Sequence, residues 1–151
     1  MKLAGIDFNL NHKAVEVYIS GCCVPHCEGC HNEELWSFER GHNPFGSLMS
    51  LIIQKGNLPI TKRVWIMGGE PLDQDLERLW RFIAMIKHFS PPDFEIWLWT
   101  RYTHIPEKIS KYITHAKVGS YQKNLDPYTD TEYGVTLASL NQRIIKIGVD
   151  K

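Results

Sequence analysis

The chain has 151 residues, 43% of them hydrophobic, which is an ordinary composition for a globular protein with one core. Seventeen basic residues balance seventeen acidic ones, so no field of one sign favours nucleic acid or an anionic membrane as a partner. The N-terminal apolar stretch is short, contains Asp7 and leads into no run long enough for a signal sequence or a membrane span. We therefore expect a single domain over residues 1–151 and a cytoplasmic location.

The predicted elements alternate between strands and helices. Alternating apolar residues predict a first strand at 14–19, in which Val15, Val17 and Ile19 share one face. Apolar residues at helical spacing predict a helix at 72–88, with Pro71 in the favoured first-turn position. In chain order we expect a strand at 14–19, a helix at 47–54, a strand at 62–67, a helix at 72–88, a turn at 90–93, a strand at 94–99, a helix at 106–114, a strand at 116–119, a turn at 125–128 and a strand at 143–147.

This alternation favours an α/β fold with a parallel sheet and right-handed crossovers. Ligands of such folds bind at the carboxyl ends of the strands. Three motifs of this chain fall there: a cysteine run after the first strand, residues 68–71 after the strand at 62–67, and residues 100–103 after the strand at 94–99. A closed eight-stranded barrel needs about 250 residues, so we expect a truncated, open (β/α) partial barrel of about five or six mostly parallel strands. An open side suits a large substrate, because a second protein can cover it and exclude water.

The first motif is a run of cysteines directly after the first predicted strand. Cys23, Cys27 and Cys30 have the spacing C-x3-C-x2-C. Three thiolates on one short loop can hold three corners of a cubane iron–sulfur cluster, whereas a purely electron-carrying cluster normally takes four cysteines. One iron is then left open to a ligand, as in catalytic rather than structural metal sites.

Zinc is the alternative metal for this loop, with Cys22, His26 or His31 completing the ligand set. It is disfavoured because the sequence contains no second C-x2-C pair. We interpret Cys22 as a small buried neighbour rather than a ligand. Disulfides are also disfavoured, because all four cysteines lie between residues 22 and 30, where they cannot link distant elements.

The second motif is formed by Gly68, Gly69, Glu70 and Pro71. Two residues without side chains let the backbone approach a ligand closely, and their carbonyls can accept hydrogen bonds from an ammonium group. Glu70 adds a negative charge beside such a group. The alternative interpretation is an ordinary turn between a strand and a helix.

Together, the cysteine run and the segment 68–71 resemble the signature motifs of the radical S-adenosylmethionine superfamily. Three further segments resemble, in order and spacing, the activating proteins of the anaerobic ribonucleotide reductase. These segments are residues 29–32 with Trp36, residues 96–100 with Tyr102, and residues 141–144. The likeness extends from about residue 18 to the C-terminus.

The resemblance implies a partial barrel of the radical S-adenosylmethionine type with two cofactors, a [4Fe–4S] cluster and S-adenosylmethionine. It implies reductive cleavage of S-adenosylmethionine to a 5′-deoxyadenosyl radical, which generates a glycyl radical on the large catalytic subunit of the reductase. An electron donor such as flavodoxin or ferredoxin is also implied. Residues 68–71 would hold the methionine amino group, and no residue beyond the cluster ligands would be catalytic.

Other residues have two interpretations each. His31 could shield the cluster or pack near the adenine, and Thr100 could bind the nucleoside. The alternatives are helix capping by the neighbouring Asn32, core packing of Trp36 and a simple turn hydroxyl at Thr100. The last candidates, for ordering a loop or contacting the partner, are Asn141, Gln142 and Arg143.

The remaining aromatic and imidazole side chains are expected to have no part in the chemistry. We expect the three tryptophans of the predicted strands, Trp65, Trp97 and Trp99, to lie in the core or the barrel interior. The isolated histidines have no assigned role; they are His42, His88, His104 and His115.

The chain departs from the resembled pattern at two places. Arg101 stands where the activating proteins usually have a glycine, and residues 137–140 replace their Arg-Gly-Ser segment. The alternative functions are another small radical S-adenosylmethionine enzyme, acting on a small molecule or on a different glycyl-radical enzyme, and a zinc-stabilised binding module without catalysis.

Overall fold

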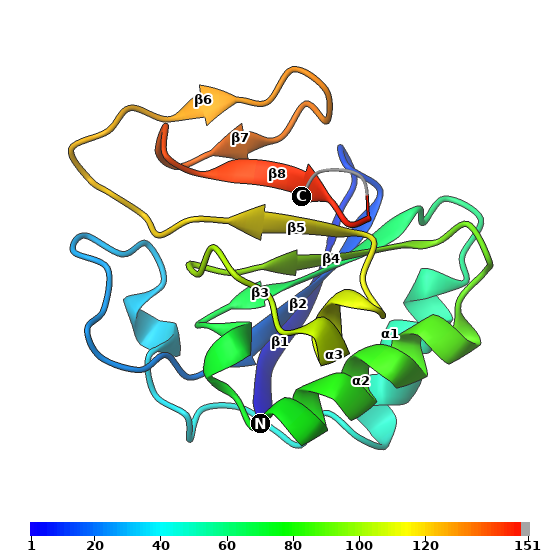
Figure 1. The fold of residues 1–151 in the computed structure, drawn as a ribbon. Coiled ribbons are helices and arrows are strands. Elements are labelled where there is room, and N and C mark those ends of the chain that lie inside the picture. Colours follow the sequence, from blue (N-terminus) through cyan, green and yellow to red (C-terminus); the bar gives the residue numbers. More distant parts are fainter. Residues whose placement is uncertain (149–151) are drawn as a thin grey trace.

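A computed structural model describes residues 1–148, and its centre is a six-stranded sheet (Figure 1). The strand order is β1-β2-β3-β4-β5-β8, with β2 to β5 parallel and the edge strands β1 and β8 antiparallel to their neighbours. The bounds are Lys2–Asn9 (β1), Ala14–Ser20 (β2), Arg63–Gly68 (β3), Glu95–Trp99 (β4), His115–Val118 (β5) and Arg143–Lys146 (β8). The expected α/β fold with a mostly parallel sheet is confirmed. The two edge strands do not pair, so the sheet is open and compatible with a partial barrel.

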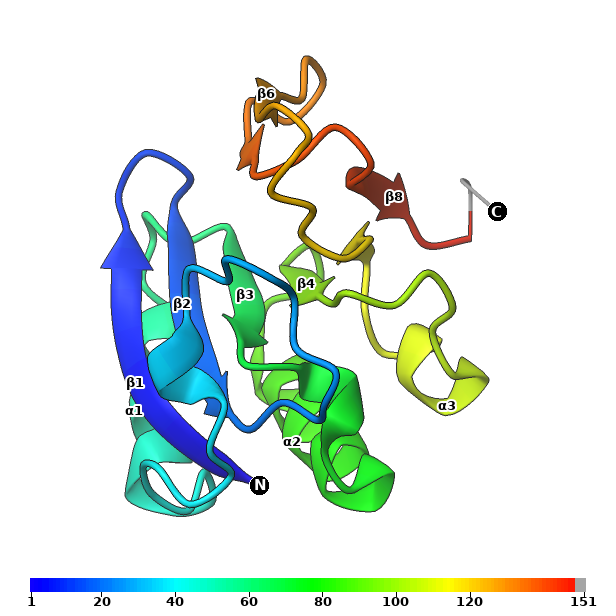
Figure 2. The same cartoon turned by 90° about the vertical axis from the view of Figure 1, so that its left-hand side faces the viewer.

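Three helices cover one face of the sheet (Figures 1 and 2). They are α1 (Ser47–Gly56), α2 (Leu76–Phe89) and α3 (Glu107–Ser110). As the alternation predicted, Val15, Val17 and Ile19 of β2 all point into this core. The helices contribute Met49, Ile52, Leu79, Phe82, Ile83, Ile86 and Ile109. Among residues 1–148, no helix has the length and apolar character that crossing a bilayer requires.

The other face of the sheet carries a second, aromatic core. Trp65 and Trp97 are buried there, and Trp99 packs against them, which confirms the interior location expected for the tryptophans. This core is covered by a short hairpin of β6 (Tyr128–Thr129) and β7 (Thr136–Leu137). The sequence analysis identified neither this hairpin nor β1, and the turn expected at 125–128 runs into β6.

The helix expected at 72–88 is wrong at its start. Residues Pro71–Asp73 form a separate 3₁₀ helix, η2, and α2 begins at Leu76. Between them Gln74 is extended, and its buried amide donates to the carbonyls of Ser20, Gly21 and Glu70 at 3.1–3.2 Å. These bonds hold the chain out of helical geometry until the side chain of Asp75 accepts a hydrogen bond from the Arg78 N–H and caps α2.

The helix expected at 106–114 is also too long. It is reduced to the single turn of α3, because the Thr114 N–H donates to the Ile96 carbonyl at 2.8 Å and draws the chain toward β5. The bounds of the other expected elements differ from those observed by one or two residues.

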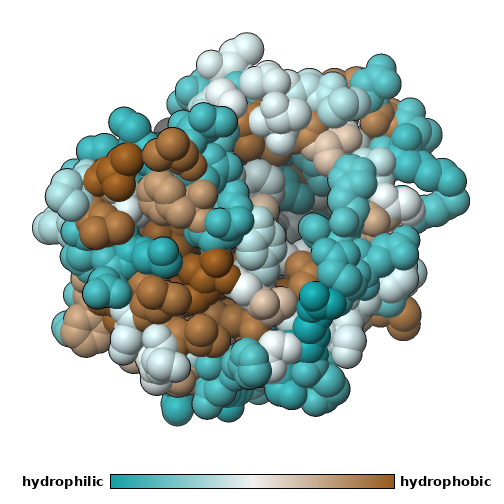
Figure 3. Space-filling view, turned by 180° about the vertical axis from the view of Figure 1, so that it is seen from behind, coloured by the Kyte–Doolittle hydropathy of each residue, from teal (hydrophilic) through white to brown (hydrophobic). Residues whose placement is uncertain are grey.

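Some large apolar side chains remain outside both cores. Leu58 and Ile60, which follow α1, are 46% and 45% exposed. Seen from behind, the surface shows apolar side chains gathered on one half of the face, beside a hydrophilic half (Figure 3).

The aromatic core gives a prediction for stability. Trp97 stacks on His115 at 4.6 Å and meets Tyr133 edge-on at 5.1 Å, so Trp97→Ala should lower the free energy of unfolding by about 3–5 kcal/mol. Chemical denaturation followed by circular dichroism measures this loss. Leu58→Ala is the control, and its effect should stay within about 0.5 kcal/mol. A loss below about 1 kcal/mol for Trp97→Ala would mean that the hairpin does not cover a packed core.

Candidate metal centre and cofactor pocket

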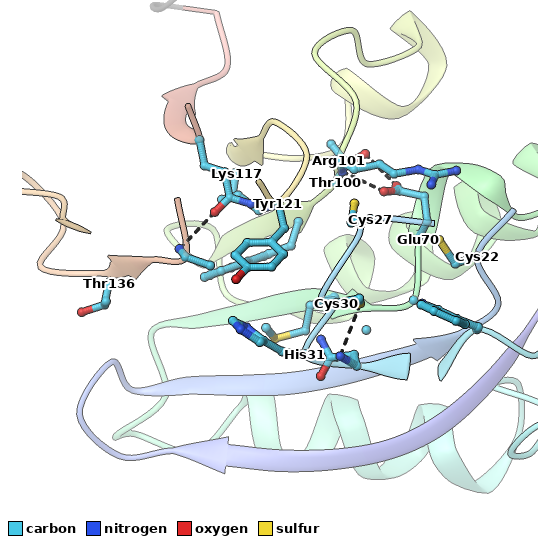
Figure 4. Close-up of a pocket in the computed structure, with 18 residues that line it drawn as sticks. Cys22, Cys27, Cys30, His31, Glu70, Thr100, Arg101, Lys117, Tyr121 and Thr136 are labelled. Atoms are coloured by element: carbon cyan, nitrogen blue, oxygen red, sulfur yellow. Dashed lines mark hydrogen bonds between the residues drawn. The ribbon is translucent and has the colours of Figure 1, made fainter. Parts of the chain in front are cut away.

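The three motifs line one cavity of about 240 Å³ at the carboxyl ends of the parallel strands (Figure 4). β2 leads into the cysteine loop, β3 into the Gly-Gly-Glu-Pro segment, and β4 into Thr100 and Arg101. The convergence expected from strand alternation is therefore present. The cavity wall includes Cys22, Cys27, Cys30, His31, Gly68, Gly69, Glu70, Thr100, Arg101, Lys117, Tyr121 and Gln142.

All four cysteines are free, and they differ in position. Cys27 and Cys30 lie on the cavity wall, and Cys22 lies there too, whereas Cys23 is exposed. Within residues 1–148, no three His, Cys, Asp or Glu side chains are gathered in a group that could hold a metal ion. The three sulfurs of the C-x3-C-x2-C run are therefore close along the chain but not assembled.

The donor set nevertheless fits an iron–sulfur cluster. Such clusters are bound by cysteine thiolates, and here a loop of free thiols borders a cavity. Burial raises the pKa of Cys22 to about 11, so its thiol stays protonated at neutral pH. The C-x3-C-x2-C spacing, in which Cys22 has no place, is what favours Cys23 as the third ligand.

The two glycines allow the second motif to lie directly against the start of the cysteine loop. The Gly69 N–H donates to the Ile19 carbonyl and the Glu70 N–H to the Gly21 carbonyl, both at 2.8 Å. A side chain at Gly69 would place its Cβ 2.5 Å from the Gly21 oxygen, and Gly68 has a φ of +116°. Larger residues are excluded at both positions, because β2 and β3 continue into loops that stay in backbone contact.

Glu70 is only 1% exposed, and its carboxylate joins the Gly-Gly-Glu-Pro segment to Thr100 and Arg101 at the end of β4. Oε1 accepts hydrogen bonds from the Leu72 N–H at 3.0 Å and from the Thr100 hydroxyl at 2.6 Å, and Oε2 accepts one from the Arg101 N–H at 2.7 Å. Burial raises the pKa of Glu70, and these three hydrogen bonds oppose that shift. The Thr100 hydroxyl also accepts from the Tyr102 N–H at 3.1 Å, so Thr100 fixes the rim from within the protein.

Lys117 is a pocket residue that the sequence analysis missed. It is half-buried on β5 and lines the cavity (Figure 4), and its Nζ donates to the Gly119 carbonyl at 3.3 Å. Burial lowers the pKa of Lys117 to about 8, so its ammonium remains charged at neutral pH. Alternation within residues 115–118 places Lys117 on the face opposite Ala116 and Val118, but four residues are a weak signal.

The aromatic neighbours of the cysteine loop pack on one another. His31 lines the cavity beside Tyr121, with ring centroids 4.7 Å apart. Trp36 stacks on His26 at 3.9 Å, and the His26 ring nitrogen Nε2 lies 2.8 Å from the Cys22 carbonyl oxygen. These contacts give the loop a fixed aromatic side.

Two of the three candidates near the start of β8, Asn141 and Gln142, order the loops around them. The Gln142 amide donates to the Gly119 carbonyl at 3.2 Å and accepts from the Ala138 N–H at 3.0 Å. Asn141 donates to the Ser120 carbonyl at 2.7 Å. Arg143 is exposed on β8 and does not line the cavity. Asn141 and Gln142 thus tie the loops after β5 and β7 together.

Comparison with known proteins places the chain in a family. A family model described as a 4Fe-4S single cluster domain matches residues 13–145. An anaerobic ribonucleoside-triphosphate reductase-activating protein of Vibrio cholerae serotype O1 is 31% identical over 117 residues, which are 76% of this chain and 67% of that protein. The protein of the same name from Enterobacteria phage T4 is 28% identical over 115 residues, 74% of this chain and 72% of that protein.

No solved structure gives a significant match to the chain. The family model nonetheless spans the whole cavity-forming region, from the start of β2 to β8. The chain therefore belongs to the family of anaerobic ribonucleoside-triphosphate reductase-activating proteins, built on a 4Fe-4S single cluster domain.

Proposed function

We propose that this chain is a radical S-adenosylmethionine enzyme that activates the anaerobic ribonucleotide reductase. The ligands of its [4Fe–4S] cluster would be Cys23, Cys27 and Cys30, with one iron open. When bound, the cluster would supply the electron that cleaves S-adenosylmethionine to methionine and a 5′-deoxyadenosyl radical, which takes a hydrogen atom from a glycine of the large reductase subunit.

The observation that carries this proposal is the meeting of the cysteine loop and the Gly68–Pro71 segment on one cavity. The Glu70 N–H donates to the Gly21 carbonyl at the start of the cysteine loop at 2.8 Å, so both segments wall the same cavity. Holding the reacting groups in fixed positions replaces a chance collision. The alternative of a non-catalytic zinc module does not account for this cavity or for the charged side chains that line it, Glu70, Arg101 and Lys117.

Residues of this chain would bind and orient S-adenosylmethionine. Residues 68–71 would receive its amino group, beside the carboxylate of Glu70. Lys117 is half-buried and lines the same cavity, where it would offer its charge to the methionine carboxylate. His31 and Thr100 would contact the cofactor or hold the residues that do.

The large catalytic subunit of the reductase would be the protein substrate, reaching the cavity at the open side of the sheet. Asn141 and Gln142 order the loops beside the cavity, so we propose that the segment including Arg143 faces this partner. A cytoplasmic flavodoxin or ferredoxin would supply the electron. No acid or base from this chain is required.

The decisive experiment measures 5′-deoxyadenosine formed from S-adenosylmethionine by anaerobically reconstituted, chemically reduced protein, with and without the large reductase subunit. Product that depends on Cys27, tested with Cys27→Ala, supports the radical chemistry, and a glycyl radical signal on the subunit supports the partner. Product without a glycyl radical would favour a different substrate. A colourless, zinc-loaded protein would overturn the proposal.

The ligand set gives a prediction with a matched control one residue away. Cys23→Ala should lose the brown cluster and all cleavage, because two remaining thiolates cannot hold it. Cys22→Ala should keep both, because the C-x3-C-x2-C spacing is complete without Cys22. Iron and sulfide content per chain and the visible absorption measure this. The reverse pattern would assign the third ligand to Cys22.

Lys117 gives a second prediction. Lys117→Met should raise the Kd for S-adenosylmethionine about tenfold or more, because a charge-assisted contact to the carboxylate is lost. Calorimetric titration of the oxidised, cluster-loaded protein measures binding without turnover. Lys111→Met removes the same charge from an exposed ion pair with Glu107 and should leave the Kd unchanged. Equal Kd values for Lys117→Met and the unmodified chain would exclude this contact.

A further inference from the structure

Arg101 reaches from the end of β4 to the cysteine loop. Its Nη1 donates to the Pro25 carbonyl at 2.6 Å, and its Nη2 donates to the Cys23 carbonyl at 2.9 Å. Nη2 also forms an ion pair with Asp73 at 3.0 Å, in which the two side chains are 15% and 6% exposed. The guanidinium therefore holds two loop carbonyls and a shielded carboxylate at once, which its planar fork allows and a lysine does not.

Asp73, the last residue of η2, also binds the cysteine loop. Its Oδ2 accepts the Cys23 N–H at 2.7 Å, and its Oδ1 accepts the Tyr102 hydroxyl at 2.5 Å. The Tyr102 hydroxyl in turn accepts from Nη2 of Arg101 at 3.2 Å. We call Asp73, Arg101 and Tyr102 the loop clamp. Both the N–H and the carbonyl of Cys23 are bound by it.

The clamp joins three segments through one residue. The backbone N–H of Arg101 donates to Glu70, while its side chain binds the cysteine loop and Asp73. A glycine, which the resembled pattern has here, offers the backbone bond alone. Arg101 thus adds a side-chain link between the cysteine loop and the end of β4. In exchange, the backbone at this position lacks the conformational freedom of a glycine.

We propose that the loop clamp holds the backbone of the cysteine loop at Cys23 and Pro25, so that only the side chains have to assemble on the cluster, and that Arg101 sets beside the loop a positive charge that offsets Asp73. The cluster in this statement rests on the proposed function. A positioned loop loses less conformational freedom when three thiolates bind one cluster. A nearby guanidinium stabilises the more negative, reduced state of the cluster and so raises its reduction potential.

The positioning is tested on the cluster-free full chain by hydrogen exchange of the amides of residues 22–30. Arg101→Gln should speed exchange there about tenfold, because hydrogen bonds to a charged group are lost. Asp73→Asn should act in the same direction. Arg81→Gln, at an exposed side chain of α2, removes one charge far from the loop and is the control. Unchanged exchange in both Arg101→Gln and Asp73→Asn would overturn the positioning role, whether or not the chain cleaves S-adenosylmethionine.

The charge is tested on the cluster-loaded protein, by the rate of iron loss to a chelator and by the reduction potential. Arg101→Gln should speed iron loss and lower the potential. Arg101→Lys keeps the charge but not the fork, so it should speed iron loss while the potential stays close to that of the unmodified chain. Equal potentials in Arg101→Gln and the unmodified chain would overturn the electrostatic part. If the unmodified, cluster-loaded chain forms no 5′-deoxyadenosine while Arg101→Gln still lowers the reduction potential, the proposed function is wrong and the role of the loop clamp is supported.

Discussion

One residue, Glu70, joins the ends of three neighbouring strands through its backbone N–H and its buried carboxylate. Glu70 follows β3, its N–H binds Gly21 after β2, and its side chain binds Thr100 and Arg101 after β4. A carboxylate in such a place is costly unless hydrogen bonds surround it, so the loss of any one donor leaves charge unsatisfied. The positions of the cysteine loop, the glycine segment and the β4 end are therefore interdependent.

The contacts around Glu70 bear on the roles expected for the second motif. A carboxylate with three internal donors is a fixed part of the wall, and its remaining acceptor capacity on Oε2 is what a bound ammonium could use. Thr100 is likewise occupied on both its donor and its acceptor side. The glycine segment and the end of β4 are thus held in place by the protein itself, whereas the three sulfurs of the cysteine run are not yet assembled.

Much of this arrangement could be predicted from local sequence pattern, and the failures have physical causes. The parallel strands were visible because Val15, Val17 and Ile19 alternate, and the motifs were visible because their spacing is local. The start of α2 could not be predicted in this way, because Gln74 is held by carbonyls more than fifty residues earlier in the chain. β1 was missed because a register shift between Leu3 and Gly5 interrupts its alternation. The role of Arg101 depends on carbonyls 76 and 78 residues away, which no spacing reveals.

The direction of β8 decides which part of the chain closes the cavity. Because β8 runs antiparallel to β5, its beginning and not its end meets the rim, so the connection before it supplies Thr136, Ala138 and Gln142 to the wall. The cysteine loop and the glycine segment come from the first half of the sequence. Insertions or exchanges within residues 120–142 can therefore reshape the entrance while the cysteine loop and the glycine segment stay as they are, so that two chains of this fold can differ in what their cavities admit and still share the same two motifs.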